Sequence, residues 1–408
     1  MIDRLKKYFL LSFIALCPLV YSTKGLSLRD VQEIFYQFFS IIVIALFIGN
    51  VWIAAFLILN VITFLHAGAD VGQTQVLNVF LAALLFMVSK AYFKKNNLTQ
   101  LFYVLIGVLL LNLGWMILQK LSLDPLFSGQ TNGGGLIPGS FNDPVGFFGI
   151  KMANGIFLSI LIPVVAFFSV PVSLALFFPI LLCQSVSAVM AGVSGILFFA
   201  YFKSKKTFLI LLPIVLLGFL AVVFLDFKVD PKTFSSRFPV WHSAVRYALK
   251  NPLGYGPDSY RNFNKLKDFV FVGDSKYNHA IAKVDPEHSN ANQKFLKVQY
   301  YNMNQIAMPP FGMDMKSPQV DFWDNPHNEF IQILFEYGLV GIIILGGFLR
   351  EIYLRFRMSE KSTEVVVLAS IILVFLVASI TQFPFHLTRL AYLMPIILGS
   401  FYGRTDTV

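Results

Sequence analysis

The stretch Asn325-Pro326-His327-Asn328-Glu329-Phe330 ends the one long polar segment of the chain and begins a hydrophobic run that contains Glu336. Asparagine caps helices well, and Pro326 favours the turn into a helix, so a helix is predicted to begin here. His327 then lies at a helix N-terminus, where the helix dipole disfavours a protonated imidazole. A neutral histidine at this place fits both an interfacial cap and a general base.

The composition is that of a polytopic membrane protein. The 408 residues are 56% hydrophobic and only 13% charged, and the mean hydropathy is +0.69. A soluble protein cannot bury this much apolar surface. The two cysteines, Cys17 and Cys183, both lie in apolar runs, so neither a disulfide framework nor a zinc-type cysteine cluster is expected. The formal charge of +10 indicates contact with membrane lipids or phosphates, and we expect no nucleic-acid partner.

The hydrophobic runs predict an all-α polytopic membrane protein with about twelve transmembrane helices. Residues 1–226 hold transmembrane helices 1–9, residues 227–327 form one large periplasmic loop domain, and residues 328–408 hold helices 10–12. The spans are expected at 8–21, 33–49, 51–66, 75–93, 98–119, 145–169, 171–183, 185–202, 207–226, 328–349, 364–382 and 389–403.

The distribution of basic residues predicts which loops face inward. With the N-terminus inside, the short inner segments hold most lysines and arginines, whereas the short outer loops hold little more than Lys24, Arg29 and Lys120. The inner basic residues are Arg4, Lys6, Lys7, Lys90, Lys94, Lys95, Lys203, Lys205, Lys206, Arg350, Arg355, Arg357, Lys361 and Arg404. This topology places residues 227–327 and all six histidines outside.

The long outer segment contains forked cationic donors. Arg237, Arg246 and Arg261 suit phosphate oxygens, although for any single arginine taken alone, pairing with nearby aspartates or lipid headgroups is the simpler interpretation. Residues 268–323 are polar, aromatic and rich in asparagine, which suits either a sugar or a small folded cap.

Several motifs resemble the O-antigen ligase and O-antigen polymerase family of integral membrane glycan transferases. They are Arg237-x-x-x-Trp241, Pro252-Leu253-Gly254-Tyr255-Gly256, Pro326-His327-Asn328, Glu336-x-Gly338-x-x-Gly341 and Gly139-Ser140-Phe141-Asn142-Asp143-Pro144 with Ala153-Asn154. The resemblance covers roughly residues 139–403. One departure is that many members carry a Ser-Arg pair in the helix at about 183–200, where this chain has no arginine and Lys151 is a candidate substitute.

The resemblance implies the bacterial inner membrane, a glycan donor carried on undecaprenyl diphosphate, and an active site facing the periplasm. The acceptor would be a glycan or lipid A core, and the reaction needs no nucleotide sugar, metal or cofactor. His327 would be the general base, Arg237, Arg246 and Arg261 would hold the diphosphate, and Asn328, Trp241 and Glu336 would support them. Glu336 is nine residues from His327, which on a regular helix puts the two on nearly opposite sides, so we expect Glu336 to pair with a neighbouring helix instead.

Other functions stay open at this stage. A polymerase would join two lipid-linked repeat units, but the single clear arginine set at 237–261 favours a ligase with one donor. Some relatives transfer glycans to protein serines. A polysaccharide transporter would need ionisable residues in mid-membrane, where most spans have none. A metal-dependent hydrolase would have to use His279, Asp285, Glu287 and His288, which lack the helical spacing of common zinc enzymes.

Overall fold

The computed structural model describes the helices from residue 73 onward and parts of the long polar segment. The described residues are 73–121, 123, 145–148, 150–224, 241, 244–246, 248–250, 254–255, 260, 269–273, 280–284, 295–300, 319–321, 326–384 and 387–406. The predicted spans 8–21, 33–49 and 51–66, together with Arg237, Arg261 and the 139–144 motif, lie outside these residues.

The chain divides into two compact units. The first unit comprises Met1–Thr63, Leu77–Val229 and Leu349–Val408, and the second comprises Phe64–Val76 and Asp230–Phe348. Helix α14 (Glu329–Met358) begins in the second unit and ends in the first.

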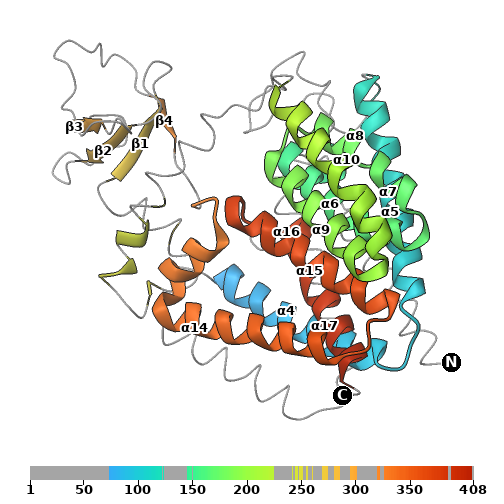
Figure 1. The fold of residues 1–408 in the computed structure, drawn as a ribbon. Helices are drawn as coiled ribbons and strands as arrows, with labels where there is room; N and C mark the ends of the chain where they lie inside the picture. The colour runs from blue at the N-terminus through green and yellow to red at the C-terminus, as the bar shows by residue number, and fades with distance from the viewer. Residues whose placement is uncertain are drawn as a thin grey trace. The chain divides into compact units, whose positions relative to one another are not determined.

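Helices make up the described part of the first unit (Figure 1). They are α4 (Gln73–Phe93), α5 (Thr99–Lys120), α6 (Lys151–Phe168), α7 (Val170–Ala175), α8 (Phe177–Leu182), α9 (Val186–Lys203), α10 (Lys205–Phe224), α15 (Thr363–Thr381), α16 (Thr388–Ala391) and α17 (Leu393–Thr405), with a short 3₁₀ turn η2 (Gly146–Phe148) before α6. Every predicted span from 75–93 onward overlaps with one of these helices, with α14, or with a pair of short helices, although α14 extends to Met358 and is broken at Gly338.

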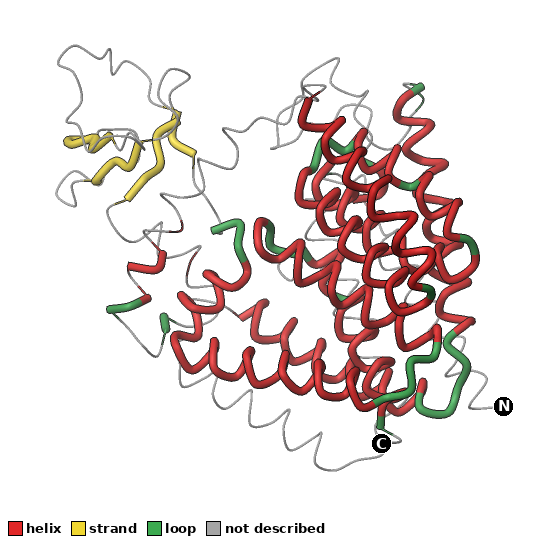
Figure 2. Tube along the Cα trace, in the orientation of Figure 1, coloured by secondary structure: helices red, strands yellow, loops and turns green. Residues whose placement is uncertain are grey.

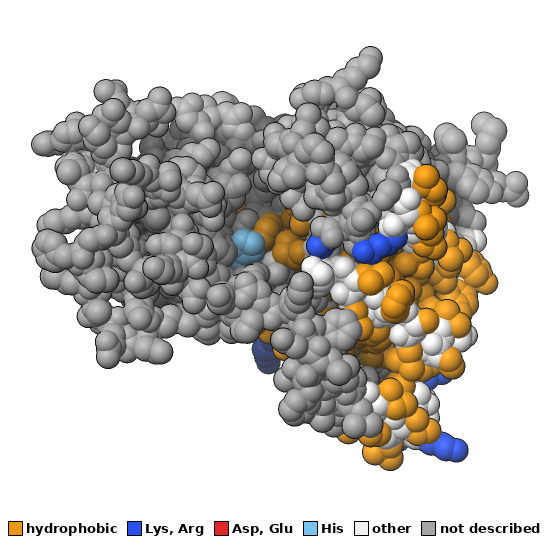
Figure 3. All heavy atoms as spheres, turned by 90° about the horizontal axis from the view of Figure 1, so that it is seen from above, with side chains coloured by type: hydrophobic (Ala, Val, Ile, Leu, Met, Phe, Trp, Pro, Cys, Tyr) orange, Lys and Arg blue, Asp and Glu red, His pale blue; other side chains and the backbone are white. Residues whose placement is uncertain are grey.

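Four of the described helices are long and apolar enough to cross a membrane, namely α5, α6, α9 and α15. α6 is the most buried of them, and α9 packs against both α6 and α15. Large hydrophobic side chains such as Leu110, Phe178 and Leu209 are more than 60% exposed on the unit's surface. Hydrophobic side chains cover most of the described surface in Figure 3, as expected of helices that face lipid.

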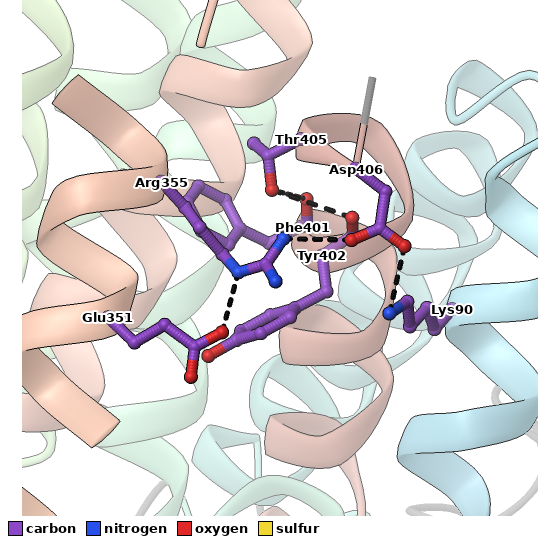
Figure 4. Close-up of polar contacts among 7 residues, drawn as sticks. All are labelled: Lys90, Glu351, Arg355, Phe401, Tyr402, Thr405 and Asp406. Atoms are coloured by element: carbon purple, nitrogen blue, oxygen red, sulfur yellow. Dashed lines mark hydrogen bonds and ion pairs between the residues drawn. The ribbon is translucent and has the colours of Figure 1, made fainter. Parts of the chain in front are cut away.

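A network of ion pairs joins the ends of α4, α14 and α17 in the first unit (Figure 4). The Asp406 carboxylate accepts from Lys90 and from Arg355, both at 2.8 Å, and Arg355 also pairs with Glu351 one turn earlier. The Arg355 guanidinium lies 4.3 Å from the centre of the Tyr402 ring. Burial alone would raise the pKa of Asp406, but the hydrogen bonds and positive charges of Lys90 and Arg355 outweigh it, and the pKa lies below its usual value. Lys90 and Arg355 are both predicted inner residues, and the structure brings them together.

The second unit contains the start of α14 and a four-stranded antiparallel sheet, the only sheet among the described residues (Figure 2). The strands are β1 (Phe269–Gly273), β2 (Ala280–Val284), β3 (Phe295–Tyr300) and β4 (Gln319–Asp321), in the order β3-β2-β1-β4. In the register Phe271 lies opposite Ile281 and Val272 opposite Val320, and β2 and β3 contain an irregularity at Lys283/Val284.

The sheet corrects the all-α prediction for this segment. The helical prediction holds for the described spans, but the loop domain is not helical throughout. The strand sequences FVFVG and FLKVQY are rich in β-branched and aromatic residues, which favour extended backbone. These strand-forming runs are short, and the rest of the segment is polar and rich in asparagine, so the sequence did not predict them as strands.

Candidate functional site

The start of α14 is capped as the sequence predicts. The Asn328 side-chain oxygen accepts a hydrogen bond from the amide of Ile331 at 3.1 Å, and the Asn328 carbonyl accepts from Gln332. Asn328 is buried, with 7% of its surface exposed. An asparagine that bonds the third amide of the helix is a strong N-cap, so the first turn of α14 is well defined.

His327 immediately precedes this cap and adopts an unusual backbone conformation. Its φ is +50°, in the left-handed region that side chains other than glycine rarely adopt, although histidine does so more often than most. The residue is half-buried. Left-handed backbone at a non-glycine residue stores about 1–2 kcal/mol and persists only where neighbouring contacts hold it.

One such contact comes from Trp241. The indole N–H of Trp241 donates to the carbonyl of Pro326 at 2.6 Å, so it fixes the peptide that precedes His327. Trp241 also packs against the buried cluster of Ala244, Tyr260 and Phe335. The Arg237-x-x-x-Trp241 and Pro326-His327-Asn328 motifs therefore meet in space at this tryptophan.

The motif that contains Gly254 and the motif that contains Glu336 and Gly338 also meet, at the end of the first segment of α14. α14 is broken at Gly338, whose φ of 64° and ψ of −160° are not helical. Gly254, with a φ of +83°, lies directly against this break, and a Cβ there would overlap with the Glu336 carbonyl and lie 2.6 Å from the Gly338 amide nitrogen. The Tyr255 amide donates to the Phe335 carbonyl at 3.0 Å. The sequence suggested each motif separately but not their contact.

Aromatic rings also pack together at the end of this first segment of α14, around Phe335. The Phe335 ring is 1% exposed and stacks on Tyr255 at 4.8 Å between centroids, with an interplanar angle of 25°. The Tyr260 ring meets it edge-on at 5.1 Å. Stacked and edge-to-face pairs contribute about 0.5–1.5 kcal/mol each beyond the area they bury.

Three polar side chains follow one face of this first segment of α14. Glu329, Gln332 and Glu336 are 1%, 1% and 2% exposed, and their spacing of three and four residues places them one above another. Gln332 donates to the Glu336 carboxylate at 2.9 Å. We expected a Glu336 partner on a neighbouring helix, whereas this hydrogen bond comes from its own helix, one turn earlier.

The opposite-sides argument for His327 and Glu336 was wrong in its premise. It assumed a regular helix between the two residues, but α14 begins at Glu329 and His327 lies before it in a left-handed conformation. The 100° rotation per helical residue therefore does not extend to His327. The direction of the imidazole does not follow from the helix.

Of the three arginines predicted to bind the diphosphate, only Arg246 lies among the described residues. Arg246 lies in a helical stretch of the second unit with its side chain exposed, and it makes no hydrogen bond or ion pair with a described residue. Arg237 and Arg261 lie outside the described residues, as do His279, Asp285, Glu287 and His288 of the metal-hydrolase alternative.

In the first unit, Lys151 is the first residue of α6, and its side chain reaches the start of α9. Its ammonium donates to the Gln184 side chain at 3.2 Å, and the next residue, Ser185, caps α9 through the Ala188 amide. Two residues later, the Ser187 hydroxyl lies 2.6 Å from that of Thr381 and accepts from Gln382. Lys151 thus approaches the start of α9, the helix at about 183–200 in which this chain has no arginine.

Comparison of the chain with protein-family models, curated proteins and solved structures finds no match.

Proposed function

We propose that this chain is an integral membrane glycosyltransferase of the O-antigen ligase type. It would move a glycan from undecaprenyl diphosphate to an acceptor hydroxyl, on lipid A core or a similar sugar, at the periplasmic face of the bacterial inner membrane. One observation carries the proposal: motifs far apart in the sequence, represented by Trp241, Gly254 and Glu336, meet along the first segment of α14, which follows His327. The left-handed backbone of His327, next to the peptide that Trp241 holds, supports a functional role beyond that of an interfacial cap.

The proposed reaction needs a base and a place for the leaving group. His327 takes the proton of the acceptor hydroxyl while that oxygen bonds to the anomeric carbon. The bond from that carbon to the phosphate oxygen breaks, and its electron pair leaves with undecaprenyl diphosphate. Direct displacement inverts the anomeric centre. The diphosphate is already an activated leaving group, so the chemistry requires no cofactor.

Cations would stabilise the charge that develops on the departing diphosphate. Arg246 has an exposed guanidinium in the second unit. Arg237 lies four residues before Trp241 in the sequence, and Arg261 directly follows Tyr260, so both are close in the chain to residues that pack against Phe335. A planar guanidinium donates two parallel hydrogen bonds to phosphate oxygens, which suits this task better than lysine.

The direct test measures transfer by purified protein in vesicles that contain a lipid-linked glycan and lipid A core. We expect His327→Ala to fold normally and to lose about 10²–10⁴-fold in turnover, the usual effect of removing a general base. His279→Ala is the matched control and should transfer normally. If His327→Ala transferred at the normal rate, His327 would be a cap and the proposal would fail.

The identity of the acceptor is tested in the host cell. After deletion of the gene, we expect a gel of the surface polysaccharide to show bare core, with full-length polymer retained on the carrier lipid. Core capped with a single repeat unit would instead assign a polymerase, in which the attacking hydroxyl belongs to a second lipid-linked unit.

A further inference from the structure

The first segment of α14 behaves as a short, separate rod. It runs from Glu329 to Tyr337, about 13 Å at ~1.5 Å per residue, and it is interrupted at Gly338. A break in a helix removes regular backbone hydrogen bonds near it, and these groups need other partners. The Phe335 carbonyl finds one in the Tyr255 amide.

The same stretch of chain contacts both ends of this rod. At its start, Trp241 holds the Pro326 carbonyl. At its end, Gly254 lies against the backbone of Glu336 and Gly338, with Tyr255 stacked on Phe335. Residues 241–255 therefore fix the rod at two points, and His327 is attached directly to the first of them.

The contact at the end of the rod has almost no freedom to adjust. A Cβ on Gly254 would meet backbone atoms of Glu336 and Gly338, which cannot rotate away as a side chain can. The φ values of Gly254 and Gly338 both lie in the left-handed region that glycine adopts readily. Any side chain at Gly254 must push the rod and the 254–255 turn apart.

We propose that Gly254 and Tyr255, docked on the break at Gly338, are positioning residues that set the place of His327. The break separates the rod from the rest of α14, and the docked turn replaces that continuity. This inference rests on the proposed function for its catalytic meaning, but the placement of His327 is a physical property that can be measured without turnover.

The test compares Gly254→Ala with two control variants, Gly346→Ala and Gly347→Ala. Both control positions lie in α14, and a Cβ there would meet nothing within 4 Å. We expect the Gly254 variant to accumulate in the membrane and to lose about 10- to 100-fold in turnover, since misplacement by about 1 Å costs this much. The KM for the lipid-linked donor should change by less than about threefold. Both control variants should match the wild type.

The second readout is the rate at which diethyl pyrocarbonate modifies His327, resolved by mass spectrometry of its peptide. We expect this rate to change at least about threefold in Gly254→Ala and not at all in Gly346→Ala. If Gly254→Ala fails to fold, Tyr255→Leu keeps the backbone amide but removes the stacked ring, and it should change the rate in the same direction.

The outcomes separate the two proposals. Unchanged turnover and unchanged His327 modification in folded Gly254→Ala and in Tyr255→Leu would overturn the positioning role, whatever His327→Ala does. Changed modification together with full activity of His327→Ala would overturn the proposed function and leave the positioning of His327 intact. Loss of protein amount with a normal rate per folded molecule would show a structural role only, and would also overturn the inference.

Discussion

The two ends of α14 are stabilised in opposite ways. Its first segment follows a histidine in left-handed backbone, and it is held by the Asn328 cap and Trp241 at its start and by Gly254 and stacked rings near the break at Gly338. Its other end is regular helix, held by ion pairs from Arg355 and capped by Lys361, whose ammonium donates to the Arg357 and Ser359 carbonyls.

This difference supports the proposed site at the start of α14. Buried backbone contacts of fixed geometry tolerate little change, whereas partly exposed ion pairs contribute little and can rearrange. Strain that neighbouring contacts maintain is found at functional sites more often than at structural ones. The start of α14 carries such strain at His327, and the end at Arg355 does not.

The largest expected effect is on the activity of reporters fused near the two ends of α14. These ends are predicted to lie on opposite sides of the membrane, so each reporter should be either fully active or inactive. A reporter fused after residue 300 should be active only outside the cytoplasm, and one fused near residue 355 only inside. Residues 260 and 205 provide a second matched pair. Cytoplasmic activity of the reporter at residue 300 would rule out a periplasmic location of the proposed site, and therefore also the proposed donor.

The next effect is at Trp241. Trp241→Phe keeps an aromatic ring but removes the donor to the buried Pro326 carbonyl, which should cost about 1–3 kcal/mol in unfolding free energy. We expect a loss of turnover of about tenfold as the peptide before His327 relaxes. Detergent-unfolding titrations and vesicle transfer assays measure the two effects.

Trp115→Phe is the matched control, because the Trp115 indole nitrogen is buried without a hydrogen-bond partner among the described residues and its ring stacks on Phe147. The Trp115→Phe substitution should leave both stability and turnover nearly unchanged. Equal effects of the two substitutions would mean that ring size matters and the hydrogen bond does not.

The smallest effect is at the other end of the helix. Asp406→Asn weakens the pairing with Lys90 and Arg355, and it should cost no more than about 1 kcal/mol while turnover stays within about twofold. Glu360→Gln, which changes an exposed carboxylate, should cost nothing measurable. A larger loss of turnover in Asp406→Asn than in Trp241→Phe would reverse the contrast between the two ends.

The pH dependence of this effect has a definite sign. The pKa of folded Asp406 lies below its usual value, so the stabilisation is present above the unfolded pKa of about 3.9 and is lost as the pH falls through the folded value. The difference between wild type and Asp406→Asn should therefore be constant between about pH 5 and 8. An unfolding titration at several pH values measures it.

Much of the helical architecture could be predicted from the sequence. Runs of apolar residues located the described helices closely, since a span must satisfy its own backbone hydrogen bonds in lipid. Asn325 and Asn328 were both suggested as caps, and Asn328 makes the cap bond, which is local in sequence. Short strands such as β1 were missed, because five residues give little periodicity against a polar background.

The contacts of the candidate site were harder to predict. Gly338 stands in an apolar run where an intact helix is the simplest interpretation, and nothing local shows that the backbone breaks there. Its contact with Gly254 joins residues far apart in the chain, which a single sequence does not reveal. The hydrogen bond from Gln332 to Glu336 was available from helical spacing alone, and it was overlooked in favour of a neighbouring helix.

The central claim is that His327 accepts the acceptor's proton. The most direct measurement is the pH dependence of transfer turnover, at saturating donor and acceptor, for wild type and for His327→Ala in the same vesicles. If His327 is the base, wild-type turnover should fall toward acidic pH within about pH 5–8, where imidazoles titrate, because a protonated imidazole cannot accept a proton. The residual turnover of His327→Ala should be about 10²–10⁴-fold lower and should lack this fall. Turnover in His327→Ala within about twofold of wild type, with the same decline in acid, would contradict the account.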